Sequence, residues 1–333
     1  MRILVSGASG FIGSAVSNKF ASEGHQVLGI DSNTNYYSPE LKKLRVAKLL
    51  IASGVEFQEL DICDFSKLDE LISNFQPEVI INLAAQAGVR LSTFDSYKYV
   101  DSNLTGFSNI LRSATLNSVP NFLYASSSSV YGNNSQVPYS EKERNLTPTS
   151  FYGATKLANE ILAPALVRGS KTRTRGMRFF TVYGPWGRPD MAYFRMISNV
   201  LTGSPFTFFG DGSVQRDFTF IDDTVKSIYS LTLELTTNSE TFSDIVNLGG
   251  GRPLSMNFLV NLIEEVLGKS VDYDVKQENI NDVIQTVADT NYLNKLIGYQ
   301  PETKLEDGIQ ETIKWASSAN IKNNLSDWVN SSK

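Results

Sequence analysis

The sequence of 333 residues contains one cysteine and one histidine. A single cysteine, Cys63, can form neither an internal disulfide nor a thiolate metal site, and this fits a reducing compartment. The single histidine, His25, stands in a predicted loop far from any serine nucleophile, which disfavours both zinc hydrolases and Ser-His-Asp hydrolases. We therefore expect no bound metal.

Basic charge and long apolar runs are also scarce. The formal net charge is -5, which argues against a nucleic-acid-binding surface, because neutralising a phosphate backbone needs concentrated basic side chains. No apolar run reaches the length of about 18 residues that spans a membrane. The first apolar strand follows directly after Met1 and Arg2, which leaves no room for a signal peptide. The sequence predicts a cytoplasmic protein with no nucleic-acid or membrane partner.

The first half of the chain alternates short β-rich runs with helical stretches, a pattern typical of a doubly wound parallel sheet. We predict an α/β fold with a Rossmann domain over residues 1–180 and a return segment near 215–235. A smaller C-terminal α/β lobe, mainly for substrate binding, is predicted over residues 181–333. The predicted strands are Ile3 to Ser6, Val27 to Asp31, Val55 to Leu60, Val79 to Leu83 and Asn121 to Ser126.

Two further helical segments differ in their side chains. Between the N-cap Ser255 and Gly268, apolar residues recur on one face and predict ordinary core packing. They are Phe258, Leu259, Leu262, Ile263 and Val266. Another segment carries four basic residues, which we interpret as the solvated face of a helix: Lys42, Lys43, Arg45 and Lys48.

Three glycines, Gly7, Gly10 and Gly13, connect the first strand to a helix. Glycines permit a tight turn and let backbone N–H groups approach a pyrophosphate at the helix N-terminus. Asp31 ends the second strand, where a carboxylate binds an adenosine ribose and repels a 2′-phosphate, so we expect NAD rather than NADP. The other residues expected at the cofactor are Phe11, Ile12, Asn33, Asp61, Ile62, Leu83, Ala84, Ala85, Gln86, Asn103, Tyr152, Lys156 and Phe180.

Tyr152 and Lys156 are spaced to share one face of a helix, and a serine-rich strand end containing Ser127 precedes them. A free tyrosine has a pKa of about 10, so acting as a base near neutral pH needs roughly 4 kcal/mol of stabilisation. Lys156 and a nicotinamide cation can supply it, while Ser127 aligns the reacting hydroxyl. The sequence therefore predicts an NAD-dependent enzyme with Ser127, Tyr152 and Lys156 as catalytic residues.

These combined features resemble the extended short-chain dehydrogenase/reductase family over nearly the whole chain. Segments 35–37, 84–90, 126–132, 178–191 and 216–223 look like UDP-glucuronate 4-epimerases, most clearly from Thr181 to Met191. The resemblance implies NAD-dependent C4 epimerisation of a UDP-uronic acid, UDP-glucuronate to UDP-galacturonate, through a transient 4-keto intermediate. It implies Tyr152 as base, tuned by Lys156, with Ser127 aligning the hydroxyl.

The same resemblance implies the substrate contacts and the assembly. Relatives bind the UDP diphosphate and ribose at the positions of Arg216 and Asp282, and seat uracil at 206–208. The uronate intermediate loses CO2 readily, so its carboxylate must be held. A homodimer is implied, paired through the helix that carries Tyr152 and Lys156 and the helix after Asn103. The expected substrate residues are Arg90, Ser127, Ser128, Ser129, Thr181, Arg188, Phe206, Phe208, Arg216 and Asp282.

Departures from related patterns bear on the reaction. Dehydratases carry Asp-Glu in place of Ser128 and Ser129, decarboxylating relatives carry Glu in place of Ser129, and galactose-type epimerases carry Asn in place of Thr181. The segment from Leu91 to Asp95 departs from the epimerase pattern itself. The alternatives left open are a UDP-glucuronate decarboxylase or C5 epimerase, a neutral UDP-sugar 4-epimerase, and a non-enzymatic NAD-binding scaffold, against which the intact catalytic residues weigh.

Overall fold

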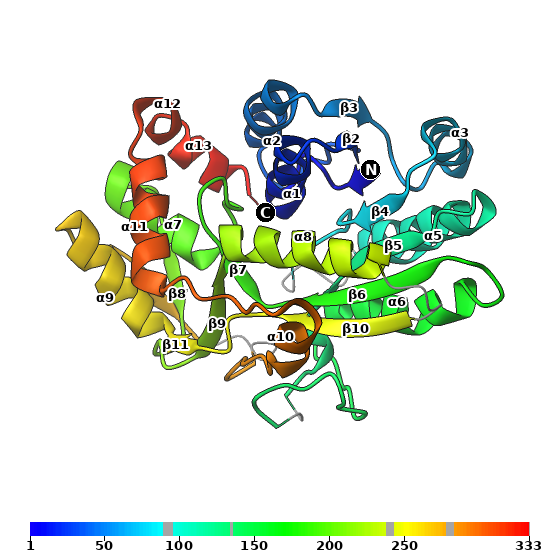
Figure 1. Cartoon of the computed structure of the whole chain (residues 1–333). Helices are drawn as coiled ribbons and strands as arrows, with labels where there is room; N and C mark the ends of the chain where they lie inside the picture. Colours follow the sequence, from blue (N-terminus) through cyan, green and yellow to red (C-terminus); the bar gives the residue numbers. More distant parts are fainter. Residues whose placement is uncertain (89–95, 134–135, 238–242, 278–282, 333) are drawn as a thin grey trace.

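A computed structural model describes residues 1–88, 96–133, 136–237, 243–277 and 283–332 (Figure 1). Its largest element is a seven-stranded sheet in the order β10-β6-β5-β4-β1-β2-β3, with every neighbouring pair parallel. This arrangement confirms the predicted α/β doubly wound fold. The strands are β1 (Arg2–Ser6), β2 (Gln26–Asp31), β3 (Glu56–Glu59), β4 (Val79–Asn82), β5 (Asn121–Ser127), β6 (Arg173–Phe179) and β10 (Ser243–Leu248).

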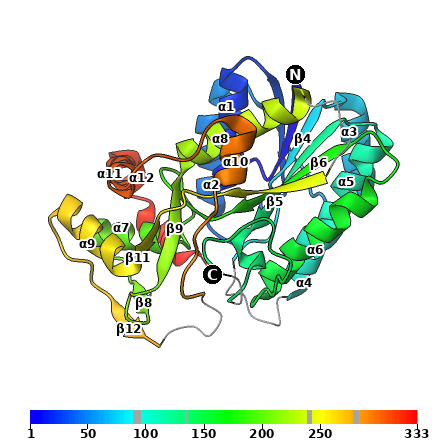
Figure 2. The same ribbon diagram turned by 60° about the horizontal axis from the view of Figure 1, so that its bottom comes forward.

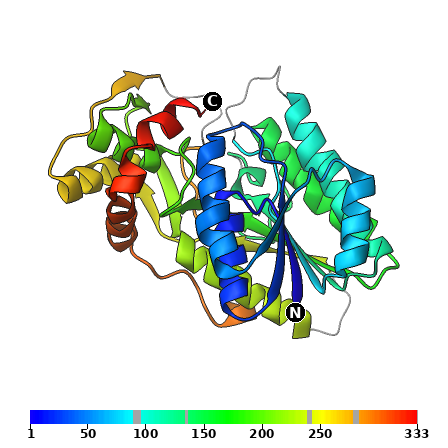
Figure 3. The same cartoon turned by 90° about the horizontal axis from the view of Figure 1, so that it is seen from above.

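Helices cover both faces of this sheet (Figures 2 and 3). Side chains alternate along β1, so that Ile3 and Val5 join one core cluster and Leu4 joins the other, and all three are fully buried. A strand buried on both faces is expected in a parallel sheet. One face is covered by α1 (Phe11–Ser22) and α8 (Ile221–Thr237), and the other by α3 (Phe65–Phe75), α5 (Phe107–Leu116) and α6 (Phe151–Leu166).

The chain changes direction across the sheet between β1 and β4. It runs outward from β1 through β2 to β3, and then returns to place β4 on the other side of β1. Ligands of doubly wound folds bind beyond the carboxyl ends of the strands at such a switch point. The carboxyl ends of β1 and β4 therefore mark the expected site.

The second part of the molecule contains two small sheets and a group of helices. One sheet has the order β11-β9-β7 and the other pairs β12 with β8. The predicted helix from Ser255 to Gly268 is confirmed as α9, with Leu259, Leu262 and Ile263 buried, although Phe258 is 38% exposed. The elements are β7 (Thr181–Tyr183), β8 (Thr207–Phe209), β9 (Gln215–Phe220), β11 (Pro253–Ser255), β12 (Asp274–Lys276), α7 (Ala192–Thr202), α9 (Met256–Leu267), α11 (Leu305–Ala316), α12 (Ala319–Lys322) and α13 (Leu325–Asn330).

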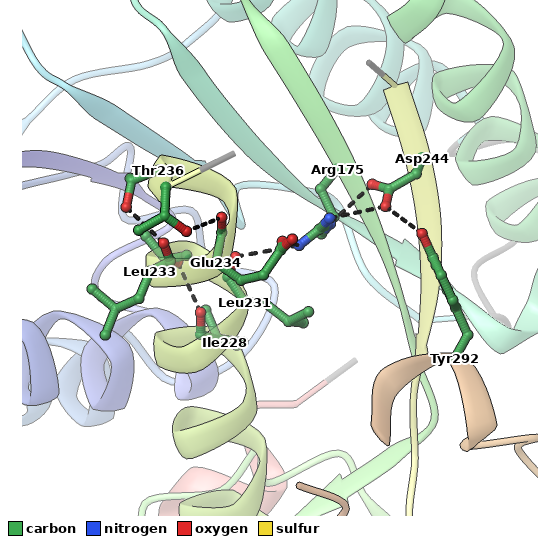
Figure 4. A network of polar contacts seen from close by, with 10 residues as sticks. Arg175, Ile228, Leu231, Leu233, Glu234, Thr236, Asp244 and Tyr292 are labelled. Atoms are coloured by element: carbon green, nitrogen blue, oxygen red, sulfur yellow. Dashed lines mark hydrogen bonds and ion pairs between the residues drawn. The ribbon is translucent and has the colours of Figure 1, made fainter. Parts of the chain in front are cut away.

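The chain returns to the large sheet after β9. Helix α8 packs against α1, and β10 then pairs with β6 at the edge of the sheet. A buried guanidinium joins these returning elements (Figure 4): Arg175 on β6 binds Glu234 of α8 at 2.5 Å and Asp244 of β10 at 2.9 Å. The hydroxyl of Tyr292, in α10 (Asn291–Ile297), donates to the same Asp244 at 2.9 Å. The returning segments are thus tied to the sheet by charge as well as by packing.

Helix α2 (Pro39–Arg45) differs from its predicted solvated face. Lys43 and Lys48 are exposed, but Lys42 is 5% exposed and Arg45 is fully buried. Both buried residues bind groups supplied by other segments, as the site shows below. In the described ranges, no helix is both long enough and apolar enough to cross a membrane.

Candidate active site

A cavity of about 880 Å³ opens at the carboxyl ends of the parallel strands. One side is formed by the loop between β1 and α1 and by the ends of β2, β4 and β5. The other side is formed by residues after β6, including β7, β8 and β9. Fifteen predicted cofactor residues line it: Gly7, Gly10, Phe11, Ile12, Gly13, Asp31, Asp61, Ile62, Leu83, Ala84, Ala85, Gln86, Tyr152, Lys156 and Phe180.

The glycine loop leaves no room for side chains. Gly7 has a φ of +72°, and a Cβ there would lie 2.7 Å from the backbone nitrogen of Ala84. A Cβ at Gly13 would lie only 2.1 Å from the carbonyl oxygen of Gly7. Gly10 precedes the first turn of α1, whose free N–H groups and dipole suit a phosphate. The loop is therefore a cradle that fits the pyrophosphate of a dinucleotide.

Asp31 and Lys42 lie close together at the end of β2, where the sequence predicts the adenosine ribose. The Asp31 carboxylate accepts from the backbone N–H of Ser9 at 3.1 Å and of Asn33 at 3.0 Å, which ties the glycine loop to the end of β2. The Lys42 ammonium donates to the Thr34 carbonyl at 2.7 Å. Burial lowers the pKa of Lys42, while Asp31 opposes this effect. Sequence reasoning missed Lys42 because it stands among the basic residues Lys43, Arg45 and Lys48, which together suggested a solvated face.

The catalytic candidates meet where α6 begins. Ser150 caps α6 by accepting from the Gly153 N–H at 3.0 Å, and Tyr152 hydrogen-bonds with Ser127. A Cβ at Gly153 would lie 2.6 Å from the Ser129 carbonyl oxygen, so a glycine is needed for this close approach. Lys156 Nζ donates to the Ala125 carbonyl at 3.0 Å and lies 5.9 Å from the Tyr152 ring centroid. Ser127, Tyr152 and Lys156 all line the cavity.

The two ionisable groups of this trio are perturbed mainly by burial. Burial raises the pKa of Tyr152, and Arg188 and the Ser127 hydrogen bond oppose that rise. Burial also lowers the pKa of Lys156 to about 8. Lowering of the pKa of Tyr152 by Lys156 together with a nicotinamide cation stays a prediction.

The side of the cavity formed after β6, where the sequence predicts substrate binding and which we call the sugar side, contains an ion pair that the sequence did not suggest. Arg188 binds Asp190 with two parallel hydrogen bonds, Nε to Oδ1 at 3.0 Å and Nη2 to Oδ2 at 2.5 Å. The Tyr36 hydroxyl donates to Asp190 Oδ2 at 3.3 Å. Burial opposes the charge of Asp190, but Arg188 outweighs it and lowers the pKa of that carboxyl. The other predicted substrate residues on the cavity wall are Ser127, Ser128, Ser129, Thr181, Phe206, Phe208 and Arg216.

Arg45 holds the loop that carries Arg188. Its guanidinium donates to the carbonyls of Trp186 and Gly187 at 2.7 to 2.9 Å, and also to the Ser9 carbonyl at 3.2 Å. The glycine loop and the sugar-side loop therefore share one buried residue. The sequence carried no signal for this role of Arg45, because a helix pattern does not show which distant loop covers a face.

Asp217 fixes a further part of the sugar side. This fully buried carboxylate accepts from the backbone N–H groups of Gly250, Gly251 and Ala288, each at 2.9 Å. Burial raises its pKa, and the backbone donors oppose that rise. Next to it, Arg216 donates to the Val283 carbonyl at 2.6 Å. Asp217 thus ties residues 250–251 and Ala288 to β9, the strand that also carries Arg216.

Four predicted site residues are not among the described residues that line the cavity. Asn103 is buried behind the cavity wall, where it accepts from the Gln86 N–H at 2.8 Å and donates to Thr155 at 3.0 Å. Asn33 is also absent from the described lining, and its side chain donates to Glu59 at 3.1 Å. Arg90 and Asp282 lie outside the described residues. Direct ligand contact by these four stays a prediction.

The glycine cradle of the parallel sheet and the tyrosine and lysine of α6 meet at one cavity. This combination defines an NAD-binding enzyme of the extended short-chain dehydrogenase/reductase type. The chain belongs to the NAD dependent epimerase/dehydratase family, whose model matches residues 3–249. NAD is therefore the cofactor, as predicted from Asp31.

Named relatives cover almost the whole chain. A probable UDP-glucuronate 4-epimerase from Rhizobium meliloti is 37% identical over 95% of this chain and 96% of its own length. UDP-glucuronate 4-epimerase 5 from Arabidopsis thaliana is 42% identical over 95% of this chain and 75% of its own length. The UDP-glucuronic acid 4-epimerase of Bacillus cereus, solved with UDP-glucuronic acid and NAD, superposes with a TM-score of 0.86 at 31% identity, covering 95% and 98% of the two chains. The predicted resemblance is confirmed.

Proposed function

We propose that this enzyme epimerises C4 of UDP-glucuronate to give UDP-galacturonate. The observation that carries the proposal is the single cavity lined by Ser127, Tyr152 and Lys156 and also by Thr181 and Arg188. The names of the relatives support the same substrate. We assign residues 1–180, with the return near 215–235, to NAD, and residues 181–333 mainly to the nucleotide sugar.

Ser127, Tyr152 and Lys156 have different roles in the proposed reaction. Tyr152 takes the proton of the 4-hydroxyl group and later returns it, while Ser127 orients that oxygen through the hydrogen bond it shares with Tyr152. The buried Lys156 supplies positive charge beside Tyr152 and a donor for the nicotinamide ribose. NAD, when bound, supplies reversible hydride acceptance at C4, and its oxidised ring carries a positive charge that favours tyrosinate.

The cavity is unsuited to elimination of water. Its described acidic lining residues are Asp31, Asp61 and Asp190. Asp31 and Asp61 stand at the ends of β2 and β3, and Asp190 is paired with Arg188. Among the described lining residues, Ser128 and Ser129 stand next to Ser127 and provide no carboxylic acid. This composition favours epimerisation over dehydration.

A uronate substrate also needs its carboxylate held still, because the 4-keto intermediate is a β-keto acid that loses CO2. Ser128, Ser129, Thr181 and Arg188 are the residues that we assign to this task. A charge-assisted hydrogen bond contributes about 1.5–3 kcal/mol, which shifts the partition between two exits from one intermediate by about tenfold or more.

The test is to incubate purified protein with NAD and UDP-glucuronate and to measure UDP-galacturonate and CO2. Wild-type protein should form UDP-galacturonate. Thr181→Ala and Arg188→Ala should epimerise more slowly and release CO2 with NADH and a 4-keto-pentose. Variants that slow without diverting carbon, or that affect UDP-glucose equally, would refute the role of these two residues. Release of CO2 by the wild-type protein would favour a decarboxylase.

We further propose a homodimer formed through α5 and α6. Both helices carry exposed apolar side chains, with Ile161 66%, Leu116 61% and Phe151 49% exposed. Such side chains on adjacent helices suit a four-helix interface. Sedimentation at micromolar concentration should give twice the chain mass, and replacing Ile161 by Glu should give the monomer.

A further inference from the structure

The ion pair between Arg188 and Asp190 is placed where substrate must meet it. Tyr36, Arg188 and Asp190 all line the cavity, and the two charged side chains are 24% and 15% exposed. Asp190 occupies Nε and Nη2 of the guanidinium, so Nη1 is the nitrogen that Asp190 does not engage. Any acid that binds Arg188 from the cavity must therefore share the guanidinium with Asp190.

The surroundings keep this pair in place. Arg45 holds the carbonyls of Trp186 and Gly187, which precede Arg188 directly in the chain. On the other side, the Tyr36 hydroxyl stands 2.2 Å from the position that a Cβ would take at Gly88, so the tyrosine is closely packed. Because backbone and tyrosine are both held, Asp190 stays beside Arg188, and its negative charge is a permanent part of the cavity wall.

The pair also lies close to the reaction centre. Among the described charges, Arg188 is the first that opposes the burial-driven rise in the pKa of Tyr152. The ring of Tyr99 connects the two places, with its centroid 6.2 Å from that of Tyr152 and its hydroxyl donating to the Gly88 carbonyl. The net charge at Arg188 therefore acts on both the bound sugar and Tyr152.

We propose that Asp190 is a specificity-determining residue whose negative charge limits how tightly Arg188 holds an acidic sugar. This inference rests on the proposed function, in which Arg188 faces the uronate carboxylate. Substrate and product of that reaction carry the same carboxylate, and binding both more tightly lowers KM without speeding the chemical step. By offsetting part of the Arg188 charge, Asp190 lets the product leave.

The test removes the charge of Asp190 and keeps its shape. Binding to NAD-loaded Tyr152→Phe protein, which does not turn over, is measured by calorimetry with UDP-glucuronate and UDP-glucose. Adding Asp190→Asn should raise the affinity for UDP-glucuronate about fivefold or more and change the affinity for UDP-glucose less than about twofold, because only the sugar of UDP-glucuronate carries a carboxylate. In the active enzyme, Asp190→Asn should lower both KM and kcat for UDP-glucuronate.

Two controls separate charge from folding. Asp190→Glu keeps the charge and should keep the wild-type preference. Asp223→Asn removes another buried carboxylate, outside the described cavity lining, where Asp223 accepts from the Tyr299 hydroxyl at 2.6 Å, and it should leave both affinities unchanged. If the asparagine variant does not fold, Asp190→Ser removes the same charge and must give the same tightening.

Two results would overturn the inference. Asp190→Asn could lower the affinity for UDP-glucuronate, which would mean that Asp190 only holds the arginine, or it could shift the affinities for both ligands equally. Failure of the proposed function looks different. In that case wild-type protein forms no UDP-galacturonate, whereas failure of the inference alone leaves wild-type epimerisation and the effect of Arg188→Ala intact.

Discussion

The cofactor side and the sugar side of the cavity are built from different parts of the polypeptide. The cofactor side consists of strand ends and glycines, where Gly7, Gly13 and Asp31 follow each other closely in the chain. The sugar side depends on side chains from distant segments, as in the bond between Tyr36 and Asp190, 154 positions apart. A backbone cradle demands small residues at fixed spacing, whereas paired side chains demand only that two loops meet. The predictions below test whether the two sides are separable.

The largest effect is expected from removing the hydroxyl group on which the chemistry of both sides depends. Tyr152→Phe should lower kcat about a thousandfold, because general base catalysis at this position is lost while the fold is unchanged. Affinities for NAD and UDP should stay within about twofold in calorimetric titrations. Turnover within tenfold of the wild type would show that Tyr152 is not the base.

Arg45 binds loops on both sides of the cavity, so its replacement should destabilise both sides. Arg45→Met leaves buried carbonyls of Ser9, Trp186 and Gly187 without a donor and should destabilise the fold by about 3 kcal/mol or more. Chemical denaturation measures this loss. The matched control is Lys43→Met on the exposed side of α2, expected within about 0.5 kcal/mol. Equal losses of stability for the two substitutions would contradict the proposal that Arg45 connects the two sides of the cavity.

Lys156 predicts a pH dependence of stability. Its pKa is lowered by burial to about 8 in the folded chain, from 10.5 when exposed. Between these values the unfolded chain binds the additional proton, so stability rises with pH from about 8 to 10.5, and below pH 8 the buried ammonium costs roughly 3 kcal/mol. Lys156→Met should therefore be more stable than wild type at pH 7, in protein without added nucleotide. This advantage should shrink toward pH 10.5 in urea titrations, and a constant difference would contradict the prediction.

The smallest effect concerns cofactor choice on the cofactor side alone. Asp31→Asn should improve NADP binding about tenfold, because the 2′-phosphate no longer meets a carboxylate and Lys42 lies nearby. Direct titration with NADP and NAD measures the change. Asp61→Asn, at the end of β3, should leave the preference unchanged. Tighter binding of NADP than NAD by wild-type protein would show that the assigned role of Asp31 is wrong.

The features that the sequence predicted correctly all depend on local backbone conformation. The glycine loop, Asp31 and the α9 boundaries at Ser255 and Gly268 are local, since each depends on backbone conformation within a few residues. Lys42 and Arg45 were misjudged because a helix pattern shows which residues share a face and not what later covers that face. The loop at 186–187 comes from far along the chain and turns the expected solvent face of Arg45 into a buried one.

The pairing of Arg188 with Asp190 was missed for a related reason. The two residues are close in the sequence, but their significance depends on the cavity and on Tyr36, which only the folded chain brings together. The sequence could identify Arg188 through resemblance. The net charge around Arg188 could not be predicted, because it depends on all the charged groups that the fold brings next to this side chain.

The return of α8 and β10 to the large sheet has a consequence for engineering. A crossover at the end of β6 would join β6 of this chain to the edge strand β10 of a relative, because β10 is exchanged together with the sugar-side residues. Recombination with a single crossover there should therefore weaken the pairing of β6 with β10, whereas libraries that exchange only residues 184–190, between β7 and α7, leave the strands of all three sheets in place. New sugar preferences are accordingly more accessible by loop grafting than by domain exchange.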